Sequence, residues 1–385
     1  MRNVLVKEFR NRFKKEPERV FFCPGRVNLI GEHIDYNGGR VMPCAISRGV
    51  WLAVSKNISK ELSFHCLNFP ETAELHLQTS YSRSGSEWFN YPLGILNHFA
   101  ENEMAVSGMD MLFYGNLPIG AGLSSSASIE VLTAFAISEM FGLSIPKTDI
   151  ALLSKKVENE FIGVNCGIMD QFAVAMGKKD KAILLDCDTL DYEYLPLYLG
   201  EYALAIINSN KPRKLTESKY NERFTECGRV LKALKKELPA EHLCDVSLGD
   251  YSAHRHLIND PVLEKRALHV ISENSRVEEA VGALRAGELL RFGQLMFDSH
   301  ESLKELYEVT GKELDTIVDF CKSFGGCIGA RMTGAGFGGC AIALINKDGI
   351  DELETQISSY YENKIGYKPE VFVSEVGEGV KELLK

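Results

Sequence analysis

The chain has 385 residues, of which 45% are hydrophobic and 25% charged, proportions typical of a globular protein large enough for two domains. Its formal net charge of −10 argues against binding to nucleic acid, which depends on many basic contacts to phosphate. Residues 1–19 are too charged for a secretory signal, no apolar run approaches the ~18 residues of a membrane helix, and the ten cysteines lack zinc-site spacing, so we expect a cytoplasmic protein.

The apolar pattern predicts a mixture of strands and helices before Asn210. A short amphipathic helix over residues 4–14 precedes a strand, RVFFCPG, that enters a loop rich in glycine and charge. A helix over residues 124–141 is apolar on nearly every side, which predicts that it is buried. The other elements expected here are strands in SRGVWLAVSKN, LSFHCLNF, GMDMLFYG, KAILLD and YALAIINSN, and helices in EWFNYPLGILNHFA, residues 148–161 and GIMDQFAVAMG.

Charged helices dominate after Asn210. We expect them over about 214–237 and 262–306 and in KELDTIVDFCKSF, followed by the glycine-rich GGCIGARMTGAGFGGCAIALI. A helix near 350–364 and a strand, EVFVSEV, close the pattern. Because strands and helices mix without regular β–α–β alternation, the pattern favours an α+β fold. We place a boundary near residue 200, between an N-terminal domain, 1–200, and a C-terminal domain, 201–385.

The loop CPGRVNLIGEHIDYNGG, from Cys23 to Gly39, combines four glycines with an arginine, a glutamate, a histidine and an aspartate. Glycines allow a ligand to approach the backbone closely. The interleaved charges suit a polar ligand. We therefore expect this loop to bind a small polar molecule rather than only to connect two strands.

A second glycine-rich segment, GNLPIGAGLSSSAS, runs from Gly115 to Ser128 directly into the buried helix. Such a turn directs free N–H groups and the positive end of the helix at one point, an arrangement suited to phosphate. An ordinary serine N-cap is the alternative, but three consecutive serines exceed what a cap requires. The segment GAGFGG leads into a strand rather than a helix, which excludes a dinucleotide fingerprint, and GLSSS lacks the last glycine of a hydrolase nucleophile elbow.

The third segment, VENEFIGVNCGIMDQF, carries Glu158 and Asp170 on either side of two glycines. Two carboxylates beside a phosphate-binding turn suggest one metal ligand and one acid/base group. The alternative is a pair of solvated acids on helix surfaces. Asp170 stands next to Met169 and the apolar stretch FAVAM, a poor place for a solvated acid, which favours a functional role.

Together these segments resemble the GHMP superfamily of small-molecule kinases and, within it, the galactokinase family. GRVNLIGEHIDYNGG is similar to the galactokinase signature, GLSSSAS to the phosphate-binding motif and RMTGAGFGGCAIAL to the third motif of the superfamily. CGIMDQF and NSNKPRKLTESKYNERFTECGR also follow galactokinase spacing. The resemblance covers about residues 20–380. It implies two α+β domains with the active site between them, and transfer of phosphate from ATP to the anomeric C1 hydroxyl of galactose with Mg²⁺ as cofactor.

The resemblance also implies a role for individual residues. Arg26 and Asp170 would flank the attacking hydroxyl, with Arg26 stabilising the transferred phosphoryl group. Asp170 would act either as the base or as a positioning group, because a neighbouring arginine favours its charged, weakly basic form. Ser126 and Glu158 would bind Mg²⁺, and the loop Thr333–Gly339 would approach the phosphates. The implied sugar-binding residues are Glu32, His33, Asp35, Gly167 and Tyr220, and the implied ATP-binding residues are Gly120, Gly122, Leu123, Ser124, Ser125, Ser126 and Ala127.

Two other functions stay open. One is a kinase for a related sugar, such as N-acetylgalactosamine or arabinose. The other is a non-catalytic regulator that binds sugar and ATP; the intact Ser126–Ala127 step, Arg26 and Asp170 favour the enzyme over it. No obligatory protein partner is evident. Helical spacing places Arg223 and Cys227 beside Tyr220, and we expect those two side chains to form a packed face rather than to do chemistry.

Overall fold

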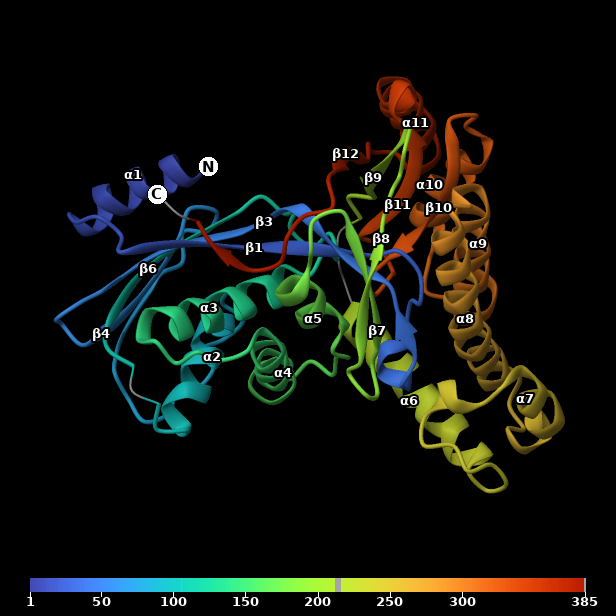
Figure 1. Ribbon diagram of the computed structural model, residues 1–385, viewed down its shortest axis with the longest axis horizontal. Helices are drawn as coiled ribbons and strands as arrows, with labels where there is room; N and C mark the ends of the chain where they lie inside the picture. The colour runs from blue at the N-terminus through green and yellow to red at the C-terminus, as the bar shows by residue number, and fades with distance from the viewer. Residues whose placement is uncertain (105, 212–215, 384–385) are drawn as a thin grey trace.

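A computed structural model describes the chain apart from residues 105, 212–215 and 384–385, and gives only the backbone of residues 216–218. Residues 212–215, part of the segment NSNKPRKLTESKY quoted above, therefore lie outside the described residues. Figure 1 shows two groups of elements side by side, with the first 200 residues mainly in one group and the long charged helices in the other. In the described part of the chain, no helix is long and apolar enough to cross a membrane.

The first group is built on a six-stranded sheet in the order β13-β1-β3-β6-β4-β5. Helix α1 lies on one face of this sheet, whereas α3 and α5 pack on the other with α2 and α4 behind them (Figure 1). The strands are β1 (Arg19–Asn28), β3 (Pro43–Lys56), β4 (Glu61–Cys66), β5 (Ala73–His76), β6 (Met109–Gly115) and β13 (Lys381–Glu382). The helices are α1 (Arg2–Phe13), α2 (Asn90–Glu101), α3 (Ser125–Phe141), α4 (Lys147–Val157) and α5 (Met169–Met176), with the π-helical turn η2 (Glu158–Ile162) after α4.

Helix α3 is the central helix of this group, and the prediction that it is buried is confirmed. Most of its residues, from Ala127 to Met140, are inaccessible to solvent. It ends at Gly142, whose φ of 66° is the left-handed conformation that glycine adopts without strain. It packs against β1 and β3, and its start is joined to β1 by hydrogen bonds from the Arg26 amide to the Leu123 carbonyl and from Ser128 Oγ to the Pro24 carbonyl.

The second group is built on an antiparallel four-stranded sheet in the order β10-β11-β9-β12. The predicted stretch over 262–306 is divided at Gly287, whose φ is 73°, so two helices form instead of one. The strands are β9 (Tyr202–Asn208), β10 (Cys327–Thr333), β11 (Cys340–Asn346) and β12 (Glu370–Ser374). The helices are α6 (Thr216–Leu234), α7 (Leu248–His254), α8 (Pro261–Ala286), α9 (Leu289–Ser302), α10 (Lys312–Ser323) and α11 (Ile350–Ile365).

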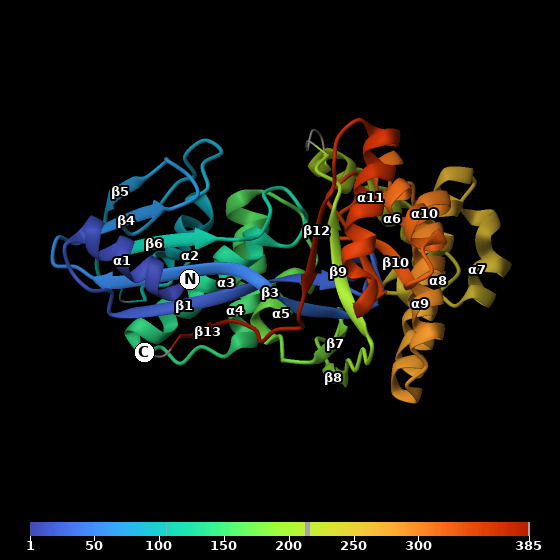
Figure 2. The ribbon, with the colours of Figure 1, turned by 90° about the horizontal axis from the view of Figure 1, so that it is seen from above.

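Short segments join the two groups. A three-stranded sheet contains β2 (Arg40–Val41), β7 (Lys181–Asp186) and β8 (Tyr192–Pro196). The chain also returns at its end, since β13 pairs with β1, and Figure 2 shows this last segment running back along the first sheet. The α+β class is confirmed. The domain boundary near residue 200 stays a prediction. The sequence did not reveal β5 and β8, because AELH and YEYLP are too short to show a clear alternation.

Candidate active site

A cavity of about 540 Å³ lies where the glycine-rich segments meet, a size within the usual range for small-molecule sites. Every sequence-predicted site residue lines it except Ala127, whose side chain lies in the hydrophobic core beneath the turn. Further lining residues that the sequence did not single out are Tyr91, Val164, Cys166 and Met169. Two residues of the glycine loop 333–339, Gly334 and Ala335, also line the cavity, as expected for that loop.

Arg26 and Asp170 meet in a bidentate ion pair on the cavity wall. Arg26 stands near the end of β1 and is 3% exposed, whereas Asp170 in the first turn of α5 has a side chain 32% exposed. Arg26 Nε and Nη2 donate to the two carboxylate oxygens at 2.8 Å each. Ser124 Oγ donates to Asp170 Oδ2 at 2.7 Å. These three donors fix the carboxylate while its exposed edge remains open to a ligand.

The turn before α3 has the backbone geometry that its sequence predicts for a phosphate-binding turn. Gly120 and Gly122 have φ values of 72° and 75°, and Ser124, just before α3, has a φ of 63°. The Ser124 hydroxyl donates to Asp170 and makes no cap hydrogen bond to the helix. The first amides of α3 therefore keep their capacity to bind an anion, which the helix dipole also favours. Arg26 Nη1 donates to the Gly122 carbonyl at 2.8 Å and so joins the turn to the ion pair.

Asp35 and Gly167 both line the cavity and lie in contact with each other. A Cβ atom on Gly167 would lie 1.8 Å from Asp35 Oδ2, so Asp35 in its present position excludes any larger residue there. Burial, assisted by the nearby charges of Asp170 and Glu32, raises the pKa of Asp35 to about 7. The sequence suggested both residues separately but gave no sign of their contact.

Glu32 is held by Arg331, a residue that the sequence analysis missed. Arg331 is fully buried in β10, and its Nη2 donates to Glu32 Oε2 at 2.7 Å while Nη1 donates to the Asn28 carbonyl at 2.9 Å. Burial still raises the pKa of Glu32 above its ordinary value, although Arg331 opposes this shift. The arginine at the start of the glycine-rich segment RMTGAGFGG could have indicated this pair, because a buried arginine is usually paired with a buried acid.

Glu158 and Ser126 lie together in the wall of the cavity. Burial raises the pKa of Glu158 to about 7, and a hydrogen bond from the Ser126 hydroxyl opposes the rise. Gln171 Nε2 donates to Glu158 Oε2 from behind. Glu130 on α3, fully buried next to Glu158, has a pKa well above its ordinary value because of burial. Glu130 was not predicted, since a single glutamate on a buried helix shows no pattern.

His33 and Tyr220 also line the cavity. The His33 ring is 3% exposed, and its centroid lies 5.5 Å from that of Tyr220. Both ring nitrogens have protein partners, the Tyr36 hydroxyl at 2.9 Å and the Ala335 carbonyl at 3.1 Å. A sugar hydroxyl would therefore bind a ring nitrogen only by displacing one of these partners.

The raised pKa of Asp35 gives a testable dependence of stability on pH. The unfolded carboxyl ionises near pH 4 and the folded one near pH 7, so ionisation favours unfolding between these values. This contribution makes the protein less stable as pH rises from about 4 to 7, with no further loss above. Asp35→Asn should remove it, so the difference in Tm between Asp35→Asn and wild type should grow from pH 5 to pH 8 in calorimetry without ligand. A pH-independent difference would contradict the assignment.

The comparisons with known proteins agree with this geometry. Residues 7–56 match the galactokinase galactose-binding signature, residues 90–178 the N-terminal domain of GHMP kinases and residues 280–363 the GHMP C-terminal domain. A galactokinase of Clostridium tetani is 49% identical over 99% of this chain and 97% of its own length. A galactokinase of Staphylococcus carnosus is 46% identical over 99% of both chains.

Solved structures give the same picture. The crystal structure of Lactococcus lactis galactokinase complexed with galactose has a TM-score of 0.96 and 42% identity, covering 99% of each chain. The mevalonate kinase of Methanococcus jannaschii has a TM-score of 0.70 and 22% identity, covering 93% of this chain and 98% of its own. At that identity the second match shows a shared fold alone.

Proposed function

The chain belongs to the galactokinase family of GHMP kinases and catalyses ATP-dependent phosphorylation of galactose, and from this premise we propose how its residues divide the work. The observation that carries the proposal is the Arg26–Asp170 ion pair, which is bonded to the Gly122 carbonyl of the turn and whose Asp170 charge is near enough to Asp35 to help raise the pKa of Asp35. A hydroxyl bound beside Asp170 would face a phosphate bound on the turn. The anomeric C1 hydroxyl of galactose is the proposed nucleophile.

Phosphoryl transfer depends mainly on positioning and on stabilisation of charge, because its transition state is loose. We assign Asp170 to hold the attacking hydroxyl, and two roles stay open for it there: the base that takes up the proton, or a group that only positions the nucleophile. Arg26, with its guanidinium on both Asp170 and the Gly122 carbonyl, would stabilise negative charge on the transferred group. The ATP phosphates would accept hydrogen bonds from the turn, whose proposed residues are Gly120, Gly122, Leu123, Ser124, Ser125, Ser126 and the backbone of Ala127.

The sugar would occupy the other side of the cavity. Its proposed neighbours all line this cavity, and they are Glu32, His33, Asp35, Gly167 and Tyr220. The two carboxylates suit pairs of neighbouring hydroxyl groups, since each can accept more than one hydrogen bond. Their raised pKa values indicate that they are weakly solvated and therefore gain from a polar ligand.

We propose Mg²⁺ as the cofactor, held by Ser126 and Glu158. Among the described residues, no group of three or more His, Cys, Asp or Glu side chains could hold a metal ion by itself. A single hydroxyl and a single carboxylate nevertheless fit Mg²⁺, which keeps several waters and takes most of its other ligands from nucleotide phosphates. When bound, the ion would neutralise phosphate charge. The proposed metal ligands also explain why an acidic protein could bind ATP.

Glu158→Gln should raise the Mg²⁺ concentration for half-maximal activity by about tenfold or more, because the amide cannot replace a charged oxygen ligand. The measurement is ADP release against free Mg²⁺ at saturating ATP and galactose. Glu160→Gln is the matched control, since Glu160 lies two residues away on the same π-helical turn with its side chain 68% exposed. Equal Mg²⁺ dependence in the two variants would remove Glu158 from the metal site.

The test of the whole proposal is a sugar panel with purified protein and Mg-ATP. The panel contains galactose, N-acetylgalactosamine, arabinose, glucose and a blank without sugar, and ³¹P NMR identifies the phosphorylated carbon. We expect the highest kcat/KM with galactose and the phosphate on C1. A higher value with N-acetylgalactosamine or arabinose would reassign the substrate, and binding of galactose without ADP release would favour the non-catalytic regulator.

We also propose a cytoplasmic location. The ten cysteines are free thiols in the structure, as is usual for proteins kept in a reducing compartment. Cell fractionation with a thiol-labelling reagent would test this proposal. Labelling of intact cells by a membrane-impermeant reagent would contradict it.

A further inference from the structure

A chain of side-chain hydrogen bonds leads from helix α6 to the glycine loop of the cavity. Cys227 Sγ lies 3.1 Å from the Tyr307 hydroxyl, which lies 2.8 Å from the Tyr36 hydroxyl. The Tyr36 hydroxyl lies 2.9 Å from His33 Nδ1, and His33 Nε2 lies 3.1 Å from the Ala335 carbonyl oxygen. Four segments that are far apart in the sequence are thereby linked in one line.

The chemistry of the last acceptor fixes the direction of every bond in this chain. A carbonyl oxygen only accepts, so the proton of His33 must be on Nε2, and Nδ1 of the neutral ring is then an acceptor. The Tyr36 hydroxyl must donate to Nδ1, so its oxygen accepts from Tyr307. The Tyr307 oxygen in turn accepts from the Cys227 thiol. Burial and the nearby His269 lower the pKa of His33 to about 3, which keeps the ring neutral and consistent with this geometry.

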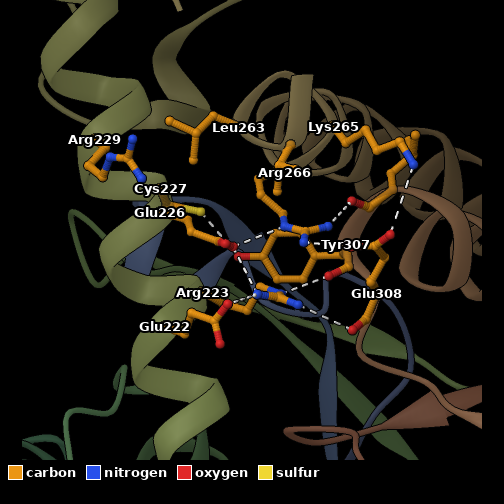
Figure 3. A network of polar contacts seen from close by, with 12 residues as sticks. Glu222, Arg223, Glu226, Cys227, Arg229, Leu263, Lys265, Arg266, Tyr307 and Glu308 are labelled. Carbon is orange, nitrogen blue, oxygen red and sulfur yellow. Dashed lines mark hydrogen bonds and ion pairs between the residues drawn. The ribbon is translucent and has the colours of Figure 1, made fainter. Parts of the chain in front are cut away.

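Two buried arginines, Arg223 and Arg266, lie beside Tyr307 (Figure 3) and bind the backbone there. The π-helical turn η5 (Leu303–Tyr307) ends here, and the last carbonyls of a helix have no partner within it. Arg223 Nε donates to the Tyr307 carbonyl at 2.8 Å, and Arg266 Nη1 donates to the Leu306 carbonyl at 2.6 Å. Arg266 Nη2 also donates to Glu308 Oε2 at 2.7 Å.

Glu226 joins the two arginines and completes the support. Its Oε2 accepts from Arg223 Nη1 and from Arg266 Nε, each at 2.9 Å (Figure 3). Because charges at this depth are stable only when paired, the network fixes α6 firmly against α8 and η5. The same α6 carries Cys227, so both ends of the Cys227–Tyr307 bond are held by the network. The expected packed face of Arg223 and Cys227 is confirmed, since both side chains are buried.

The other end of the chain touches the phosphate-binding turn through the glycine loop. Gly334 precedes Ala335 and has a φ of 86°, and a Cβ atom there would lie 2.8 Å from the Gly122 carbonyl oxygen. The same position would lie 3.8 Å from Arg26 Nη2. A shift of Ala335 would therefore be transmitted to the turn and to the arginine of the ion pair.

We propose that Tyr36 and Tyr307 are positioning residues of the kinase. Their hydroxyls hold His33 in the tautomer with the proton on Nε2, and His33 in that tautomer holds the Ala335 carbonyl, so that the glycine loop stays closed on the phosphate-binding turn. Cys227 ends the chain on α6. The kinetic consequence rests on the proposed galactose kinase activity, whereas the tautomer of His33 does not.

The test combines NMR of ¹⁵N-histidine-labelled protein with kinetics on the full chain. In wild type, the long-range ¹H–¹⁵N spectrum should show an unprotonated Nδ1 on His33, assigned with His33→Asn. Tyr36→Phe and Tyr307→Phe keep the rings and remove one hydroxyl each. Both should change the His33 Nδ1 signal and lower kcat by about three- to tenfold, the size expected for one lost buried hydrogen bond. Tyr251→Phe is the control, because it removes a hydroxyl that donates to the Glu264 carbonyl, and neither residue lines the cavity.

Cys227 supplies the second pair of variants. Cys227→Ala should change the His33 Nδ1 signal and lower kcat, in the same direction as the two tyrosine variants. Cys227→Ser restores a donor and should therefore recover both the signal and kcat. An unchanged His33 signal in Tyr36→Phe and Tyr307→Phe would overturn the proposal. It would also be overturned if the loss of kcat were proportional to the loss of Tm in all variants, including Tyr251→Phe. Wild-type protein with the expected His33 signal but no galactose turnover would leave the chain in place and contradict the proposed function instead.

Discussion

Replacing Asp170 by asparagine is expected to lower kcat with galactose by about 10²- to 10⁴-fold, the usual contribution of a general base in the transition state. The asparagine keeps the size of the side chain but cannot accept a proton. Its amide N–H group would also face an N–H donor of Arg26, which in the wild type binds Asp170 Oδ2. Galactose affinity should change little, because the proposed sugar contacts lie mainly on Glu32 and Asp35. The measurements are ADP release for kcat and calorimetric titration for galactose binding.

Asp149→Asn is the matched control, since Asp149 is an exposed acid in the first turn of α4. The pH profile separates the two roles left open for Asp170. If Asp170 is the base, the wild-type kcat falls at low pH and this fall disappears in the asparagine variant. If Asp170 is a positioning group, its replacement lowers kcat equally at all pH values. Turnover at the wild-type rate would remove Asp170 from the mechanism.

Gly167→Ala should raise the KM for galactose by about 10- to 100-fold, with little change in the KM for ATP. The new methyl group would lie 1.8 Å from Asp35 Oδ2, so the carboxylate must move out of its position. The expected size corresponds to the loss of a hydrogen bond to a charged group, about 1.5–3 kcal/mol. Gly167 does not have a positive φ, so the backbone itself tolerates alanine and the effect is limited to Asp35.

A double-mutant cycle tests this cause directly. If Gly167→Ala acts by displacing Asp35, then adding it to Asp35→Ala should have little further effect on the KM for galactose. Gly282→Ala is the control, because a Cβ atom at Gly282 in α8 meets no atom within 4 Å. Additive effects of the two substitutions would show that Gly167 acts in another way.

Local sequence was sufficient to predict the conformation of the main segments at this site. The turn before α3 could be predicted because glycines at 120 and 122 permit positive φ values and a run of serines before an apolar helix has few other uses. The burial of α3 followed from its composition. Motif order along the chain was sufficient to bring Arg26 and Asp170 to one site by resemblance, although 144 residues separate them.

Which side chains of the site are in contact depends on the tertiary structure. The contact of Gly167 with Asp35, the bond of Arg331 to Glu32 across 299 residues and the bond of Tyr36 to Tyr307 across 271 residues join positions without any common pattern. Propensity and periodicity describe neighbours along the chain, and they contain no information about the sheet edge or helix face that a distant segment meets. The burial of Glu130 beside Glu158, the return of β13 to β1 and the direction of the hydrogen bonds at His33 depend on such meetings, so they follow only from the packing of the whole chain.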